Sequence, residues 1–335
     1  CYQALIYFLL VSHDVRNGFI DAYLNFFTEF SKTIYFNKGN PLNPEEFEDF
    51  TNTYSERFNY VEDKSEFLQK AYNSGIISCS SLGTYSFGYP YLYYYFAGKY
   101  FSDQWNETDS PSHVDAVREV HTILENLHKT SNAYIAIFIA HHTKNASFLN
   151  TIIETANSIY SNYEPATLTP ETLNVFGKQT LTMCLPSLPA ESSVAKNRQK
   201  VLEEQDKIEE NRKKETDDED EVEDDFSKEL RRSIKTVEVV GAIIKNRAGS
   251  LDIDKLKYMF AAGMYVHLRH LTCFLKLIEK ITEAADYSDF LIDRIKGRFP
   301  EKSNEQLKEI ANKLFWTMNH GVIYGLIRKI AKSLG

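Results

Sequence analysis

Residues 87 to 101, Phe-Gly-Tyr-Pro-Tyr-Leu-Tyr-Tyr-Tyr-Phe-Ala-Gly-Lys-Tyr-Phe, decide how this chain folds. Pro90 suits the first position of a helix, because the N–H that proline lacks would have no partner there. The spacing that follows is helical rather than alternating. Four aromatic residues are predicted to fall on one face of this helix: Tyr89, Tyr93, Phe96 and Tyr100.

Two small residues on the same helix, Ala97 and Gly98, would let a neighbouring backbone come close. Because large aromatic side chains contribute most when they are buried, the pattern predicts a core helix with a heavy aromatic load. The alternative is that these aromatic rings are exposed and form a surface that binds a partner. The four aromatic residues are therefore the structural or interface candidates of this chain.

The composition favours helices over turn-rich sheets. The 335 residues include 21 Tyr and 22 Phe but only 14 Gly and 9 Pro, and Gly and Pro mark turns. A chain of this length suggests two domains or an extended helical array. We therefore predict a mainly all-α fold, arranged as a helical array.

Net charge, cysteine spacing and hydropathy limit the partners and the cellular compartment that we expect for this protein. The net charge of −9 argues against nucleic acid as the main partner, because phosphate binding needs a cationic face. The apolar run at residues 4–11 is too short to span a bilayer. The four cysteines form no Cys-x-x-Cys pair, as expected for reduced thiols. We expect a cytoplasmic protein with no membrane partner.

The first predicted region, residues 1–107, consists of helices joined by short turns. Asn43, Pro44 and Glu46 have the pattern of an N-cap with a capping box. An antiparallel pair bent at Leu82-Gly83 follows a short helix, so a winged-helix-like element is expected near residues 65–90. The other helices expected here are Tyr2–Leu10, which should be buried, and Phe19–Phe36.

Three further regions follow, at 108–195, 196–226 and 227–335. The middle one is charged and strongly acidic, which predicts a disordered linker. Ser303 and Gln306 have the spacing of a second capping box. The helices expected in the outer two regions are 113–130, 134–141, 146–163, one that starts at Thr169-Pro170-Glu171, 226–244, 256–280, 307–318 and 321–334.

The sequence contains no motif that we assign to catalysis or to cofactor binding. A phosphate loop needs a Gly-rich turn that ends in Gly-Lys-Ser/Thr. Gly98-Lys99 is followed by Tyr100, and Gly177-Lys178 is followed by Gln179. Neither pair therefore ends a phosphate loop.

Histidines give the only metal-site hypothesis. His121 and His128 are two turns apart and fall on one helical face, and His141 and His142 follow. These four are the candidate ligands of an alternative function, a stand-alone helical metal-dependent enzyme. Satisfied surface or interface histidines are the ordinary interpretation. His267 and His270 flank Arg269 and are interpreted as polar residues of a helix face.

Three stretches, in this order, carry a family resemblance. They are residues 1–6 with 21–26, the aromatic helix 87–101, and residues 232–246, which end in Gly-Ala-Ile-Ile-Lys-Asn, with 249–251 beyond. Together they resemble the C-terminal helical region of bacterial STAND ATPases, the NACHT-like signalling NTPases.

The resemblance implies a regulatory role, with many such proteins acting in bacterial antiphage or conflict defence. It implies that this chain, which opens on Cys1 rather than Met, is a fragment that follows an NTPase core. ATP and Mg would then bind in the core of the parent protein and not in this chain. The implied partners are that core and a protein partner or further copies.

Overall fold

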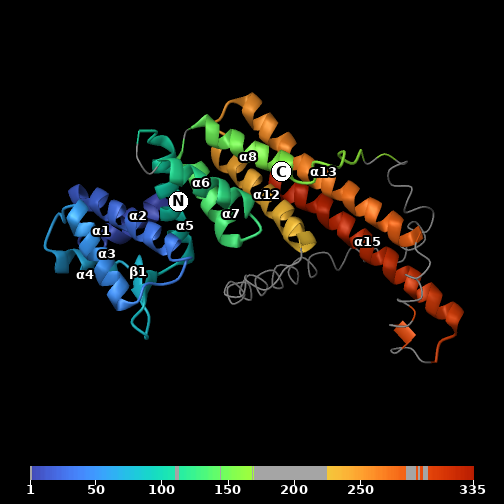
Figure 1. Ribbon diagram of the computed structural model, residues 1–335, viewed down its shortest axis with the longest axis horizontal. Helices are drawn as coiled ribbons and strands as arrows, with labels where there is room; N and C mark the ends of the chain where they lie inside the picture. Colours follow the sequence, from blue (N-terminus) through green and yellow to red (C-terminus); the bar gives the residue numbers. More distant parts are fainter. Residues whose placement is uncertain are drawn as a thin grey trace, which may run out of the picture. The chain divides into compact units, whose positions relative to one another are not determined.

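The computed structural model (Figure 1) describes residues 2–109, 113–143, 145–167, 169, 225–283, 292, 295–296 and 301–335. These residues form eleven α-helices and one two-stranded sheet, which confirms the prediction of a mainly all-α fold. The chain divides into two compact units, Cys1–Ile152 and Ile153–Gly335. No helix of the described part is long and apolar enough to cross a membrane.

The first unit packs helices around one small hairpin. Its helix α5 packs against α2 and α7. Helix α8 continues past the division of the units. The elements are α1 (Tyr2–Val11), η1 (Asn17–Phe19), α2 (Ile20–Phe36), α3 (Pro44–Arg57), α4 (Lys64–Asn73), β1 (Ile77–Cys79), β2 (Tyr85–Phe87), α5 (Pro90–Asn106), α6 (His113–Glu125), α7 (Thr130–His142) and α8 (Ala146–Ser158).

The predicted capping box at the start of α3 is confirmed. The Asn43 side-chain oxygen accepts the Glu46 N–H at 3.0 Å, and the Glu46 carboxylate accepts the Asn43 N–H at 2.8 Å. Two of the N–H groups that a helix start leaves unpaired are thereby satisfied.

Replacing Asn43 by alanine is expected to lower the free energy of unfolding by about 1 kcal/mol, because the cap is lost. Urea denaturation followed by circular dichroism measures the change. Thr53→Ala is the matched control, since Thr53 is exposed on the same helix. An equal loss in the two variants would contradict the role of the cap.

The predicted order of a short helix and a hairpin is present. Helix α4 is closed by Gly75, whose φ of 71° is in the left-handed region that glycine adopts without strain. Gly83, with φ of 81°, makes the turn between the strands. The strands are antiparallel, with Ile77 opposite Phe87 and Cys79 opposite Tyr85.

The core of the first unit is aromatic. Gly98 on α5 lies so close to α7 that an added methyl group would be 2.9 Å from the Ile139 nitrogen, which confirms the predicted close approach of a backbone. The fully buried rings around α2 and α5 belong to Tyr23, Phe26, Phe27, Phe30, Phe67, Phe96 and Phe101.

Several predictions for the first unit differ from the structure, and among them the helix predicted over 146–163 ends at Ser158. Helix α1 buries Ile6 and Leu10 but exposes Phe8 to 66%, so only one stripe of this apolar helix meets the core. The helix predicted over 113–130 ends at Glu125. There, the Asn126 side chain donates to the Thr122 carbonyl at 2.8 Å, and such a side-chain bond competes with the helical ladder.

The second unit is built on α12 (Asp225–Arg247), α13 (Ile253–Glu283) and α15 (Asn304–Leu334), each of which contacts the other two. Leu334 lies against Gly263, while Ile323 and Leu326 share a cluster with Leu271 and Ile278. Helices α13 and α15 therefore run antiparallel.

The predicted capping box of Ser303 and Gln306 is confirmed. The predicted division of the last helix before Gly321 is wrong, because α15 is continuous and Gly321 faces open space. The acidic linker at 196–226 falls outside the described residues up to 224, and Asp225 and Phe226 belong to α12. The helix start predicted at Thr169-Pro170-Glu171 also falls outside them, apart from Thr169. The division into four regions stays a prediction.

At Gly241 the backbones of α12 and α15 lie very close together. An added methyl group would lie 2.7 Å from the Ser333 carbonyl carbon, which is backbone and cannot rotate away. We expect Gly241→Ala to lower the free energy of unfolding by about 1–3 kcal/mol through overpacking.

Gly325→Ala is the matched control for Gly241→Ala. Gly325 lies inside α15 with open space around it, so alanine there should stabilise the helix by about 0.5–1 kcal/mol. Urea midpoints of both variants make the comparison, and shifts of the same sign would contradict the tight approach at Gly241.

Candidate functional site

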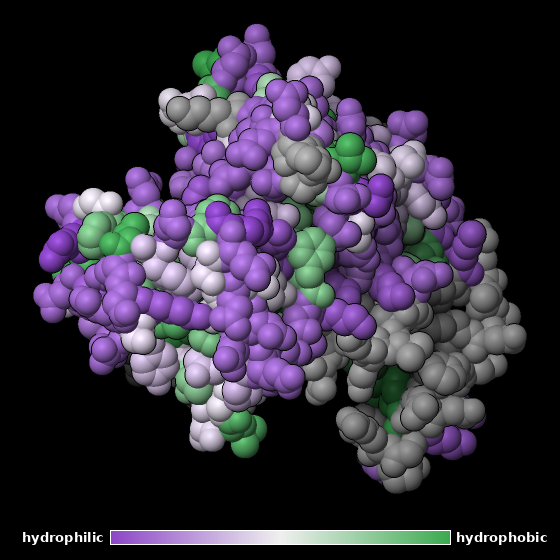
Figure 2. All heavy atoms as spheres, turned by 60° about the vertical axis from the view of Figure 1, so that its left-hand side comes forward, coloured by the Kyte–Doolittle hydropathy of each residue, from purple (hydrophilic) through white to green (hydrophobic). Residues whose placement is uncertain are grey.

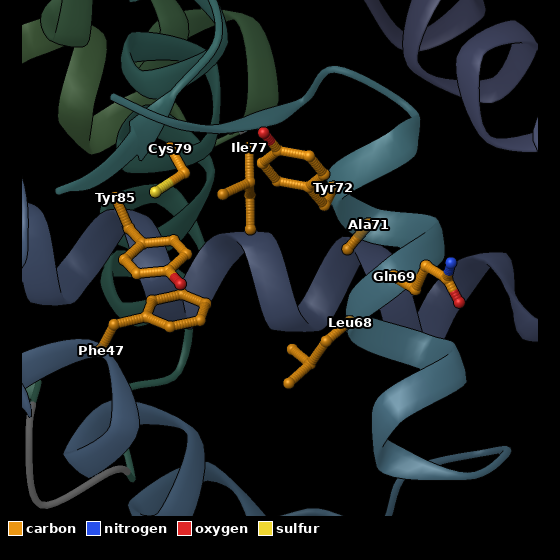
Figure 3. A pocket seen from close by; sticks show the side chains of 8 residues that line it. All are labelled: Phe47, Leu68, Gln69, Ala71, Tyr72, Ile77, Cys79 and Tyr85. Atoms are coloured by element: carbon orange, nitrogen blue, oxygen red, sulfur yellow. The ribbon is translucent and has the colours of Figure 1, made fainter. Parts of the chain in front are cut away.

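The candidate site is a pocket of about 380 Å³ beside the hairpin of the first unit. Figure 2 shows one face of the molecule, on which hydrophobic side chains appear as separate small groups among hydrophilic ones. Scattered apolar residues are ordinary on a protein surface, whereas a concave apolar site marks a binding feature. Figure 3 labels the lining: Phe47 of α3, Leu68, Gln69, Ala71 and Tyr72 of α4, Ile77 and Cys79 of β1, and Tyr85 of β2.

One wall of the pocket is a pair of stacked rings. The rings of Phe47 and Tyr85 lie 4.0 Å apart between centroids and are inclined by only 7°. Tyr85 is fixed from behind, because its N–H donates to the Leu42 carbonyl at 2.7 Å. Burial raises the pKa of Tyr85, and the neighbouring Cys79 raises it further by a smaller amount. This phenol is therefore neutral at physiological pH.

The opposite wall is the outward side of α4, and the floor is aliphatic. Ala71 and Ile77 are buried, whereas Tyr72 is 49% exposed and stands at the rim. No Asp, Glu, Lys, Arg or His side chain lines the pocket. The pocket therefore suits an uncharged apolar or aromatic group, with the Gln69 amide available at its edge.

Cys79 is a free, half-buried thiol in this lining. Its Sγ donates to the Ser80 carbonyl at 3.6 Å. The pocket itself was not predictable from the sequence, since its walls come from segments that are separate in the chain. The only local signal was the predicted hairpin after a short helix.

The structure places the four aromatic candidates differently from one another, and none of them lines the pocket. Phe96 and Tyr100 are buried, Tyr93 is half-buried, and Tyr89 is 63% exposed. The expectation that Tyr89 shares the packed face is wrong. Tyr89 is the N-cap residue with extended backbone (φ −134°, ψ 133°), so its side chain leaves the helical row.

The candidate metal ligands His121, His128, His141 and His142 are not brought into one site. His121 is exposed beside Trp105, with 6.2 Å between ring centroids. His142 packs on Tyr95 at 4.6 Å, and burial lowers its pKa to about 4. In the described part of the chain, no group of three or more His, Cys, Asp or Glu residues could hold a metal ion.

The interpretation of His267, Arg269 and His270 as polar residues of a helix face needs correction, because all three are buried. The Arg269 guanidinium donates to the carbonyls of Ile159 at 3.0 Å and Ala156 at 2.7 Å. These hydrogen bonds satisfy a buried charge with main-chain acceptors. Arg269 thus fastens the end of α8 to α13 within the second unit.

Comparison with known proteins adds one match. Residues 40–97 match the sequence profile of a family described as Novel STAND NTPase 4. Over this segment the chain is similar to that STAND NTPase family. No curated protein and no solved structure matches the chain.

The segment matched to the STAND NTPase family contains every residue of the pocket lining. It runs from the loop before α3 to the first half of α5. Of the three stretches that resemble STAND ATPases, it includes most of the aromatic helix and neither of the other two.

Proposed function

We propose that this chain is the non-catalytic regulatory and interaction region of a STAND-type signalling NTPase. The observation that carries the proposal is the match over residues 40–97, which covers α3, α4, the hairpin and the first half of α5. The printed sequence has no phosphate loop, so ATP and Mg are assigned to an NTPase core elsewhere in the parent protein.

The build of the first unit supports a role in relaying a signal. Helix α5 packs on α2 and α7, and its Phe96 ring contacts Phe27 and Phe87 at 5.3 and 5.7 Å between centroids. Interiors packed in this way shift as a body rather than deform continuously. A trigger bound near the hairpin would therefore displace α5 and the helices that contact it.

The setting rests on the resemblance of the three stretches described above. As part of this proposal, we assign the parent protein to the bacterial cytoplasm and to antiphage or conflict defence. The proposed partners are the parent's own NTPase core and a protein partner or further copies of the chain. No membrane and no nucleic acid is assigned as a main partner.

The gene sequence upstream of the Cys1 codon tests this function. We expect a continuous reading frame that encodes a Gly-x-x-x-x-Gly-Lys-Ser/Thr loop. A start codon directly adjacent to Cys1, or a frame without such a loop, would overturn the proposal.

A second test compares ATP hydrolysis by the full parent protein and by a variant in which Phe96 is replaced by alanine. A regulatory region predicts a changed hydrolysis rate, although no residue of this chain touches the nucleotide. Tyr89→Ala, at an exposed position of the same segment, is the control and should leave the rate unchanged. Equal rates in all three proteins would count against regulation.

A further inference from the structure

Polar side chains from three elements meet in the pocket of the first unit. Tyr72 of α4, Cys79 of β1 and Tyr85 of β2 all line it (Figure 3). The Tyr85 hydroxyl forms a side-chain hydrogen bond with the Cys79 thiol, and Tyr72 is close enough to raise the pKa of the same phenol. No hydrogen bond among the described residues takes up the Tyr72 hydroxyl or the Gln69 amide, so both can bond to a molecule in the pocket.

The apolar walls around these groups are held by the core. The stacked rings of Phe47 and Tyr85 form one wall, 4.0 Å apart between centroids. Phe47 in turn contacts the fully buried Phe30 at 5.8 Å between centroids, and the floor residues Ala71 and Ile77 are buried. An aromatic ligand gains ring–ring contacts with such a wall, beyond the gain from burying its apolar surface.

The size and the lining of the pocket are together typical of a small-molecule site. Such sites have volumes of about 300–1,000 Å³ and combine apolar walls with a few convergent polar groups. The pocket here has a volume of about 380 Å³. Its polar groups are two phenols, an amide and a thiol, so hydrogen bonds rather than ion pairs would orient a ligand.

The surroundings of the pocket favour a small molecule over a protein partner. Exposed polar residues stand next to the lining in the chain, with Glu46 and Glu48 on either side of Phe47 and Asn73 after Tyr72. The central part of a protein interface is depleted of charge, whereas two carboxylates flank the aromatic wall here. The same carboxylates repel an anionic ligand.

We propose that this pocket binds a small, neutral aromatic molecule that carries a hydroxyl or carbonyl group. The ring of this molecule packs on the stacked rings of Phe47 and Tyr85. Its polar group hydrogen-bonds with the Tyr72 hydroxyl or with the Gln69 amide at the rim. The inference goes beyond the proposed function, because the binding needs no NTPase core.

The test uses methyl 4-hydroxybenzoate as the probe, since this aromatic ester is neutral and has both a hydroxyl and a carbonyl group. Methyl NMR spectra of the whole chain are recorded while the probe is added. We expect saturable shifts of the Ile77 and Leu68 signals, with a dissociation constant of about 1 mM or less for a ligand of this size. The Ile323 signal, from a residue of the second unit, is the internal control and should not move.

Two relatives of the probe isolate the chemistry of the site. The carboxylate 4-hydroxybenzoate should bind about tenfold more weakly or worse, because its charge would be buried without an ionic partner. Methyl 4-hydroxycyclohexanecarboxylate keeps the polar groups and lacks the aromatic ring. It should bind about threefold more weakly or worse, because the ring–ring contacts are lost.

Two substitutions on α4 isolate the place of binding. Tyr72→Ala removes a hydroxyl and part of a wall at an exposed position of the rim, so folding should be little affected. We expect a several-fold loss of affinity for the probe. Asn73→Ala is the matched control, because Asn73 is the next residue, is exposed and lies outside the lining, and it should leave the affinity unchanged.

Four outcomes would overturn the proposal. They are the absence of saturable shifts at Ile77 and Leu68, equal affinity for the ester and the carboxylate, equal affinity of the unaltered chain and Tyr72→Ala, and tighter binding of N-acetyltyrosine N-methylamide than of the ester. The last compound carries a phenol on a peptide backbone, so its preference would assign the pocket to a side chain of a partner protein. None of these results depends on the gene upstream of Cys1, so this proposal and the proposed function fail separately.

Discussion

Replacing Phe96 by alanine is expected to lower the free energy of unfolding by about 3–5 kcal/mol, which is the range for a phenylalanine removed from a packed core. The Phe96 side chain is fully buried. Its ring lies 5.3 Å from that of Phe27 and 5.7 Å from that of Phe87. The helices and hairpin that hold these rings cannot collapse into the space without moving α5, so the cavity remains.

Urea denaturation of the whole chain measures this loss, with Tyr89→Ala as the matched control. Tyr89 precedes the same helix and is 63% exposed, so its truncation should change the free energy of unfolding by about 0.5 kcal/mol or less. Tyr93→Ala should fall between the two, because Tyr93 is half-buried. A loss below about 1 kcal/mol for Phe96→Ala would mean that the ring is not part of the core.

Lowering the pH from 7 to 5 is expected to cost the second unit about 4 kcal/mol of stability, or about 2 kcal/mol for each of two buried histidines. Burial lowers the pKa of His267 to about 3 and the pKa of His270 to about 4. In the unfolded chain a histidine has a pKa of about 6.5. As the pH falls, the unfolded state therefore binds protons before the folded state does.

The pKa values also give the pH range over which stability is lost. The stability that the two neutral histidines contribute is fully present above about pH 6.5. It is lost progressively as the pH falls toward the folded pKa values of about 4 and about 3. The groups that face His267 are His270 on α13, Lys329 on α15 and Glu238 on α12. The first two oppose its protonation and Glu238 favours it, while burial dominates all three.

His267→Phe isolates this effect. Both ring nitrogens of His267 are buried without a hydrogen-bond partner among the described residues, so an apolar ring of similar shape removes an unsatisfied group. We expect higher stability at pH 7 and roughly half the loss between pH 7 and pH 5. His270 is retained, and its Nδ1 remains 3.1 Å from the Ser233 hydroxyl. An unchanged pH dependence would contradict the assignment.

Features that depend on neighbours along the chain were predictable from the sequence alone. The capping boxes at Asn43 and Ser303 use residues three positions apart, and the hairpin turn needs only the left-handed backbone of Gly83. The helical pattern of the aromatic stretch and the close approach at Gly98 also follow from local residue size and spacing.

Features that depend on which surfaces meet were decided by the tertiary structure. The sequence pattern of α1 is apolar throughout, yet only the stripe with Ile6 and Leu10 finds a partner within the unit. The pocket exists because α3, α4 and the hairpin converge, and the burial of His267 exists because α12 and α15 cover α13. Hydrogen-bonding rules act over a few residues, whereas burial depends on segments far apart in the chain, and no local pattern records which of them will pack together.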